Sequence, residues 1–355
     1  MDFKPLKIGN LIAPIPIIQG GMGIGVSSSK LASAVAAEGG IGVLSAAQLG
    51  YNEHGFEKKP LETNLKSIKK HITLAKSLCP NGILGINIMV ATNYYKEHVQ
   101  AAIKSGIDLI ISGAGLPIML PKLVKGSNVK IAPIVSSLKA AKIILKLWDK
   151  HDNVCPDLII IEGPKAGGHL GFKLNELNDT NFDFDKSVID IINETKKYEK
   201  KYNKNIPIVV GGGVFDGNDI AHYLNLGASG VQMATRFVVT EECDASQEFK
   251  NAYINCSKDD IQIVKSPVGM PGRAIRNKFV ENNSKSNCKV SHCYNCLEPC
   301  NPANTPYCIS KALINAVNGN LDDGLIFCGQ NAYKLTKMTT VKDLINELIT
   351  ELHSV

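Results

Sequence analysis

The chain has 355 residues, of which 44% are hydrophobic and 20% are charged, and its formal net charge is +6. This is the composition of a globular protein with a large core, and the basic excess is too small to indicate a nucleic-acid partner. The basic residues gather in helix-like stretches such as 66–70 and 196–204, which we expect to face solvent.

The sequence also argues against secretion and against a membrane partner. Its first residues lack the basic and apolar regions of a secretory signal. Its apolar runs are far shorter than the roughly 20 residues of a membrane helix. Ten cysteines in such a chain are expected to be reduced or metal-bound rather than paired. We therefore expect a cytoplasmic protein, and no pattern indicates its oligomeric state.

Eight short apolar runs alternate with longer amphipathic stretches as far as Phe237. Each run is almost continuously hydrophobic, which is typical of strands buried on both faces of a parallel sheet. The predicted strands span residues 15–18, 41–44, 83–90, 107–111, 130–135, 158–161, 206–210 and 230–237.

Helix signals lie between the predicted strands. Serines at 27–29 can cap a helix that runs through Ala36, and two glycines follow it. Residues 138–149 and 187–202 show the i, i+3, i+4 spacing of helices that pack on a sheet.

This alternation predicts a (β/α)8 TIM barrel over residues 1–237, with a doubly wound open sheet as the alternative. Residues 238–330 are rich in Cys, Asn and Pro and are expected to be a long insertion after strand 8, near the rim where βα loops gather. Within residues 331–355, a helix at 340–353 capped by Thr340 would close the barrel.

The seventh predicted strand runs directly into Gly211-Gly212-Gly213. Glycines there let backbone N–H groups approach an anion without a Cβ in the way, and Asp216 or Asn218 can cap the next helix. The eighth strand brings Thr235 and Arg236 to the same rim, where barrels often bind phosphate. We predict a phosphate site here, with a simple tight turn as the alternative. Arg236 is expected to be structural, paired with a carboxylate on an outer helix.

Two further loops at predicted strand ends carry candidate site residues. Gly20, Gly21 and Met22 follow the first strand and suit a platform for a planar ring, whereas the acidic residue of a dinucleotide fingerprint is missing. His169 follows Gly167 and Gly168 after the sixth strand, so it is sterically free to face a ligand, and its pKa range suits acid–base chemistry. A structural histidine is the alternative.

Five motifs in this order resemble the nitronate monooxygenase family, formerly called 2-nitropropane dioxygenase. The same flavoprotein superfamily includes the FMN-dependent enoyl-acyl-carrier-protein reductases. The resemblance extends from residue 5 to about residue 280. The motifs are IQGGM at 18–22, GINIM at 85–89, AGGHLG at 166–171, GGG at 211–213 and VQMATRF at 231–237.

The resemblance implies that the chain is an FMN-dependent oxidoreductase. Gly20 to Met22 would line the isoalloxazine ring, Asn87 would hydrogen-bond the flavin, and the loops at 212–213 and 234–235 would bind the phosphate. His169 would be the catalytic residue over the ring. The residues expected to contact FMN are Gly20, Gly21, Met22, Asn87, Gly168, Gly212, Gly213, Gln232, Met233, Ala234 and Thr235.

The reaction has two flavin-dependent alternatives and one without flavin. The preferred hypothesis is oxidation of alkyl nitronates with O2, a small-molecule substrate, with His169 acting at the flavin ring. The alternative is an NAD(P)H-dependent enoyl thioester (enoyl-acyl-carrier-protein) reductase, or a related flavin reductase, on the same scaffold. A flavin-free aldolase or isomerase would depend on Lys165 or Glu162 and is less favoured. Residues 266–274 are a candidate lid, in which Arg273 is structural or contacts an anionic substrate.

Four cysteines in the predicted insertion follow a C-x2-C-x3-C-x7-C pattern. Four thiolates at such spacing can hold zinc or an iron–sulfur cluster, although the spacing matches no common zinc or ferredoxin pattern. Free thiols in a compact loop are the alternative. The candidate ligands are Cys293, Cys296, Cys300 and Cys308.

Overall fold

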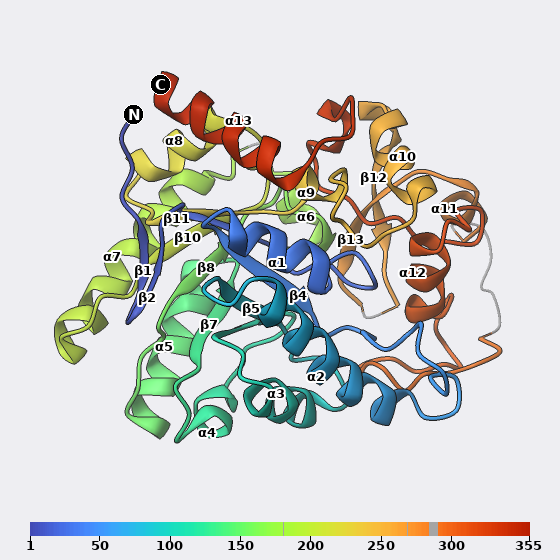
Figure 1. The fold of residues 1–355 in the computed structure, drawn as a ribbon, viewed down its shortest axis with the longest axis horizontal. Helices are drawn as coiled ribbons and strands as arrows, with labels where there is room; N and C mark the ends of the chain where they lie inside the picture. The colour runs from blue at the N-terminus through green and yellow to red at the C-terminus, as the bar shows by residue number, and fades with distance from the viewer. Residues whose placement is uncertain (180, 268, 284–289) are drawn as a thin grey trace.

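The computed structural model describes residues 1–179, 181–267, 269–283 and 290–355. Eight parallel strands close into a barrel with the order β10–β11–β3–β4–β5–β6–β7–β8, surrounded by helices (Figure 1). The predicted TIM barrel is thus confirmed, and pairing of β3 with both β4 and β11 excludes the open sheet. The barrel strands are β3 (Ile17–Gln19), β4 (Ile41–Ser45), β5 (Ile83–Asn87), β6 (Leu109–Ser112), β7 (Lys130–Val135), β8 (Ile159–Glu162), β10 (Ile208–Gly211) and β11 (Gly230–Met233).

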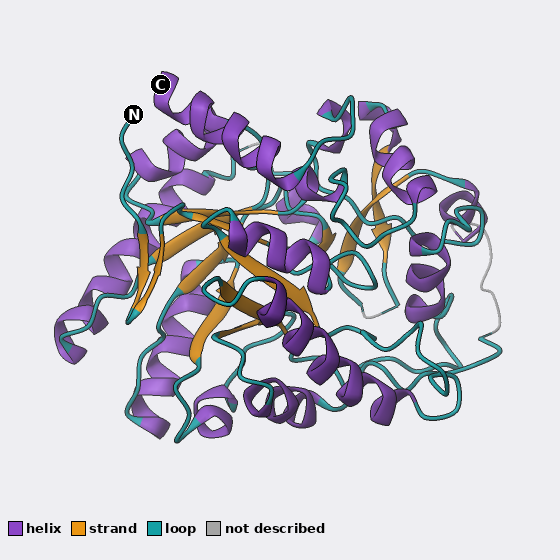
Figure 2. Cartoon of the chain, in the orientation of Figure 1, coloured by secondary structure: helices purple, strands orange, loops and turns teal. Residues whose placement is uncertain are grey.

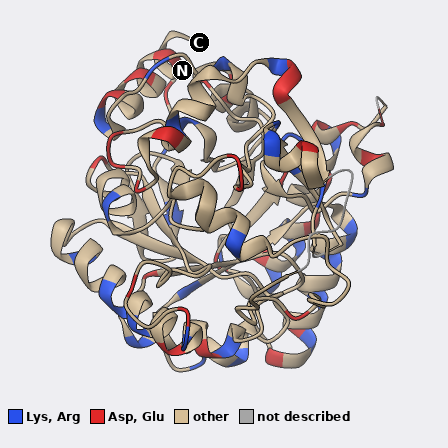
Figure 3. Cartoon of the chain, turned by 90° about the vertical axis from the view of Figure 1, so that its right-hand side faces the viewer, with Lys and Arg blue, Asp and Glu red and all other residues tan. Residues whose placement is uncertain are grey.

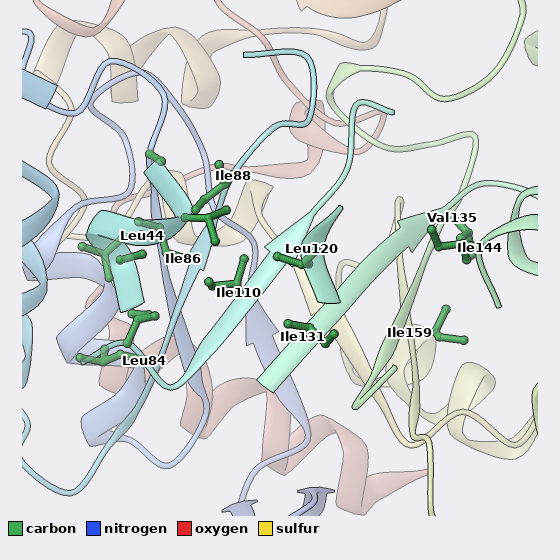
Figure 4. Packing of buried hydrophobic residues seen from close by; sticks show 14 of the residues in the cluster. Leu44, Leu84, Ile86, Ile88, Ile110, Leu120, Ile131, Val135, Ile144 and Ile159 are labelled. Atoms are coloured by element: carbon green, nitrogen blue, oxygen red, sulfur yellow. The ribbon is translucent and has the colours of Figure 1, made fainter. Parts of the chain in front are cut away.

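The strands are apolar throughout because both of their faces are buried. In β4, Ile41 and Val43 belong to the cluster inside the barrel, whereas Leu44 belongs to the layer between strands and helices. Figure 4 shows this outer layer, with Ile86, Ile110 and Ile159 from the strands and Ile144 from helix α5 (Leu138–Asp152). These apolar layers fix each strand end at the rim.

A hairpin that the sequence did not predict precedes the barrel. Strands β1 (Leu6–Ile8) and β2 (Leu11–Ala13) pair antiparallel. Leu6, Ile8 and Ala13 are buried in the same cluster as the inward-facing barrel residues. The hairpin therefore covers the end of the barrel opposite the βα loops.

Capping residues explain where several helices begin. The side chains of Ser137, Asp183, Asp216 and Thr340 each accept a hydrogen bond from a backbone N–H in the first turn of α5, α7, α8 and α13. The expected serine cap of α1 is wrong, because Ser28 makes no side-chain cap bond. These helices and their neighbours are α1 (Ser29–Ala37), α2 (Pro60–Leu78), α3 (Tyr95–Lys104), α4 (Leu120–Val124), α5 (Leu138–Asp152), α6 (Leu174–Leu177), α7 (Phe184–Tyr202), α8 (Gly217–Asn225) and α13 (Val341–Ser354).

The eighth strand ends at Met233 rather than at Phe237 as expected. Ala234 leaves the ladder and Thr235 begins a short helix, because the chain turns there at the rim. The following residues form β12, β13 and several helices to one side of the barrel (Figure 2), and these two strands join β9, from the loop after β8, in a three-stranded sheet with the order β12–β13–β9. These elements are β9 (Gly168–His169), α9 (Thr235–Val238), α10 (Gln247–Asn255), η1 (Lys258–Asp260), β12 (Ile261–Lys265), β13 (Pro271–Ile275), α11 (Lys278–Asn283), α12 (Ile309–Val317) and η2 (Ala332–Lys334).

Charged side chains of both signs are interspersed over the outer helices and loops (Figure 3). Among the described residues, no helix combines the length and the apolar character needed to cross a bilayer.

The last helix, α13, packs on α1 and α8, and we predict that it contributes strongly to stability. Leu348 on its inner face is fully buried, so Leu348→Ala should lower the free energy of unfolding by about 2–5 kcal/mol through lost burial and a cavity. Denaturant unfolding of the wild type and the variant would measure this loss in free energy of unfolding. Asn346→Ala on the exposed face is the control, and equal effects of the two changes would contradict the packing role.

Candidate functional site

A cavity of about 290 Å³ opens at the carboxyl ends of the barrel strands. Parallel strands bring their loops to this one rim, so segments that are far apart in sequence meet there. All of the residues expected from the sequence to contact FMN line this cavity, together with His169. The structure therefore brings the predicted constellation together in space.

The glycine loop after β10 has the backbone shape that an anion site requires. Gly212 and Gly213 have φ of +97° and +99°, and a Cβ on Gly212 would lie 2.7 Å from the Gly163 carbonyl oxygen. Over the described part of the chain, the N–H groups of Gly212, Gly213 and Ala234 donate no hydrogen bond to the protein backbone. These donors are available to a bound phosphate.

Arg236 does not belong to this anion site. Its guanidinium donates to the Phe215 carbonyl at 3.0 Å and to Glu347 Oε1 on α13 at 2.8 Å. The pair fixes the last helix against the loop after β10, as the sequence led us to expect.

The opposite wall of the cavity is equally tight. A Cβ on Gly21 would lie 2.6 Å from the Cβ of Asn87, so only glycine lets this loop approach β5. The side chains of Asn87, Gln232 and Thr235 line the cavity and make no hydrogen bond within residues that the structure describes. Uncommitted amide and hydroxyl groups beside a glycine platform fit a polar, planar cofactor such as a flavin.

His169 is held at the cavity by strand pairing. β9 pairs antiparallel with β13, with His169 opposite Gly272. The His169 Nε2 lies 2.6 Å from the Ser266 Oγ, and its ring packs edge-on against Phe327 with centroids 5.0 Å apart. Burial lowers the pKa of His169 to about 4, so the imidazole is neutral near pH 7.

Glu162, at the end of β8, also lines the cavity. Its Oε1 accepts a hydrogen bond from the Gly171 N–H at 2.8 Å. Burial raises the pKa of the carboxyl to about 7, although the Gly171 N–H and the Arg273 guanidinium oppose this shift. Glu162 therefore changes charge close to neutral pH.

Arg273 on β13 is structural rather than a substrate ligand. Its guanidinium donates to the carbonyls of Pro164 and Ala166, in the loop that carries His169. Val268, in the same candidate lid, lies outside the described residues. The segment is therefore tied to the βα loop by this arginine and by the β9–β13 pairing.

Sequence reasoning missed the segment at 327–331, which completes the cavity wall. Asn331 Nδ2 donates to the Gly213 carbonyl at 2.6 Å, and the Gln330 N–H donates to the Lys165 carbonyl at 3.1 Å. Ser266 was missed as a partner of His169 as well. For the segment at 327–331, the only signal in the sequence was the apolar run that ends before Gly329. Such a run indicates burial but does not show which part of the fold it packs against.

The metal hypothesis for the cysteine cluster is not supported. Within the described residues, no group of three or more His, Cys, Asp or Glu side chains is placed to hold a metal ion. Cys293 is exposed, whereas Cys296 is packed among apolar residues, where burial raises the pKa of its thiol to about 11.

We predict that Glu162 makes stability depend on pH. The folded pKa is raised from 4.5 to about 7, so the wild type loses stability relative to Glu162→Gln as pH rises through this range. The gap in free energy of unfolding between Glu162→Gln and the wild type should widen by on the order of 2 kcal/mol from pH 5 to pH 8, as measured by denaturant unfolding. Glu241→Gln, at an exposed site, is the control, and a gap that does not change with pH would contradict the shift.

Comparisons with known proteins agree with this geometry. A model of the nitronate monooxygenase family matches residues 4–351. A probable nitronate monooxygenase of Staphylococcus aureus (strain Newman) is 25% identical over 297 residues, covering 76% of this chain and 78% of that protein.

Two further proteins are similar over nearly the whole chain. A (3aS,4S,5R,7aS)-5-hydroxy-7a-methyl-1-oxo-octahydro-1H-indene-4-carboxyl-CoA dehydrogenase of Rhodococcus jostii (strain RHA1) is 24% identical, covering 95% of this chain and 92% of that protein. The structure of a nitroalkane oxidase from Streptomyces ansochromogenes has a TM-score of 0.73 at 18% identity, covering 96% of each chain, and so shares the fold. Because the family model spans almost the entire sequence, the chain belongs to the nitronate monooxygenase family and is a flavin-dependent oxidoreductase.

Proposed function

We propose that the rim cavity binds FMN. Gly212, Gly213, Ala234 and Thr235 would hold its phosphate through backbone N–H groups and the threonine hydroxyl. The loop at 20–22 would lie against the ring. The support is that a Cβ on Gly21 or Gly212 would collide with neighbouring atoms, and that the N–H donors of the phosphate loops have no backbone partner among the residues that the structure describes. Bound FMN would supply the redox chemistry by accepting an electron pair from the substrate.

We propose further that the chain oxidises alkyl nitronates with O2. The observation that carries this proposal is the neutral His169 at the cavity. Ser266 lies within hydrogen-bond distance of the Nε2, whereas the Nδ1 makes no hydrogen bond within the described part of the chain. An Nδ1–H can donate to an anionic nitronate oxygen and orient the nitronate carbon. The names of the Staphylococcus relative and of the nitroalkane oxidase agree with this chemistry.

A second candidate is the NAD(P)H-dependent reduction of an enoyl thioester. The Rhodococcus relative supports the thioester class of substrate, because its name describes a dehydrogenase that acts on a carboxyl-CoA and it matches nearly the whole chain. In this reaction His169 would polarise the thioester carbonyl or deliver a proton.

The FMN proposal predicts that Gly213→Ala lowers FMN affinity by about tenfold. A Cβ at φ +99° is strained and would lie 2.8 Å from the Lys165 side chain, so the loop must shift away from the phosphate. Fluorescence titration of flavin-free protein with FMN would measure the affinity. Gly126→Ala is the matched control. Gly126 also has a positive φ (+84°), but a Cβ added there would have no other atom within 4 Å. Wild-type protein that takes up no FMN would refute the proposal.

The reaction is tested by reducing the flavin anaerobically. We expect ethyl nitronate to reduce it rapidly and NADH or NADPH to reduce it slowly or not at all. His169→Ala should retain FMN but lower the rate of reduction by about 10²–10³-fold, as expected for loss of a hydrogen-bond donor to the reacting anion. His169→Gln, which keeps a hydrogen-bond donor, should recover part of the rate. Rapid reduction by a nicotinamide and none by the nitronate would favour the thioester reductase.

A further inference from the structure

Lys165 is the cationic side chain on the wall of the rim cavity. Among the described residues that line this cavity, no other is Lys or Arg. Lys165 lies in the loop between β8 and β9, and its side chain is exposed, so it stands at the open edge of the cavity. The proposed function leaves this charge without a role, because the phosphate donors assigned so far are neutral N–H and hydroxyl groups.

Three hydrogen bonds fix the backbone at Lys165. The Arg273 guanidinium donates to the carbonyls of Pro164 and Ala166, which flank the lysine in sequence, and the bond to Pro164 is 2.9 Å long. The Gln330 N–H donates to the Lys165 carbonyl itself at 3.1 Å. The point from which the side chain departs is therefore set by β13 and by the segment that completes the cavity wall.

From that point the side chain runs beside the loop that carries the proposed phosphate donors. A Cβ built on Gly213 would lie 2.8 Å from the Lys165 Cβ, 3.4 Å from its Cγ and 2.9 Å from its Cδ. Three successive carbons of the lysine thus lie next to Gly213, whose N–H has no backbone acceptor in the described part of the chain. The ammonium is only two bonds beyond Cδ, so it can reach an anion that this N–H holds.

The Lys165 ammonium is free to take an anionic partner. It makes no hydrogen bond and no ion pair with any residue that the structure describes. Arg236 pairs with Glu347 on α13, and Arg273 donates to loop carbonyls, so both guanidiniums are committed elsewhere. A phosphate monoester carries a charge of about −1.5 to −2 near pH 7, and hydrogen bonds from a cation to such a group are stronger than those from neutral donors.

We propose that Lys165 binds the phosphate of FMN and makes the cavity selective for FMN over riboflavin. The inference rests on the proposed FMN site, to which it adds the charge that the other donors lack. The N–H groups at 212–213 would orient the phosphate, and the ammonium would neutralise part of its charge. Lys165 is thus a specificity residue for the cofactor and not a catalytic residue.

The test measures the preference of the protein for FMN over riboflavin. The purified holoenzyme is equilibrated with FMN and a graded excess of riboflavin, and the bound flavins are separated and quantified by chromatography. The wild type should retain FMN against the excess. Lys165→Met should lower the preference by about fivefold to tenfold, because it removes the cation and keeps most of the stem beside Gly213. Lys165→Arg, which keeps the charge, should restore most of the preference.

Salt and a matched variant separate a direct contact from a general effect of charge. Raising NaCl from about 0.05 M to about 0.5 M should reduce the preference more in the wild type than in Lys165→Met, because salt screens the attraction between lysine and phosphate. Lys334→Met is the matched control. Its ammonium lies 5.2 Å from the centroid of the Phe215 ring, near the same loop, but Lys334 does not line the cavity. This change should alter the preference by less than about twofold.

An unchanged preference in Lys165→Met would overturn the inference, and so would an equal loss in Lys334→Met, which would indicate a diffuse effect of charge. Wild-type protein that shows no preference for FMN would refute the proposed phosphate site and this inference together. The assay reads flavin binding without turnover, so the proposed reaction fails separately, when ethyl nitronate does not reduce the bound flavin.

Discussion

The closure of the barrel between its first and last strands is the constraint on which the site depends. β3 pairs with β11 in parallel, with Ile17 opposite Val231, and the Gly20 N–H donates to the Met233 carbonyl at 2.8 Å. This ladder brings the N-terminal glycine loop beside the proposed phosphate loops. Without closure, residues about two hundred positions apart would not share a wall, because an open sheet leaves its two edge strands far from each other.

Burial then sets the chemistry of the groups at this rim. His169 is kept neutral because its charged form is poorly solvated, and Glu162 titrates near pH 7 for the same reason. The positive charge of Arg273 lowers the pKa of Glu162 and so opposes the effect of burial. The Arg273 guanidinium donates hydrogen bonds to two carbonyls of the loop that carries His169. Desolvation therefore governs which of the buried groups in this cavity carry a charge.

Much of the barrel was predictable because apolar runs report burial directly. The strand predicted at 130–135 has the bounds that the structure shows, and Thr340 caps the last helix as expected. The hairpin at 6–13 was missed because strands of three residues are too short to show a period. The strand predicted through Phe237 was too long, because an apolar helical turn and a buried strand look alike in sequence.

The sequence by itself determined the fold class, the glycine loops at the strand ends and the candidacy of His169, because these signals are local: burial patterns, permissive backbone and residue type. Only the tertiary structure showed that Ser266 and Phe327 contact His169 and that Arg273 anchors a loop. It also showed that, within the described residues, the four cysteines are not placed as a group that could hold a metal ion. Such facts depend on which distant segments pack together, and no local pattern encodes that packing.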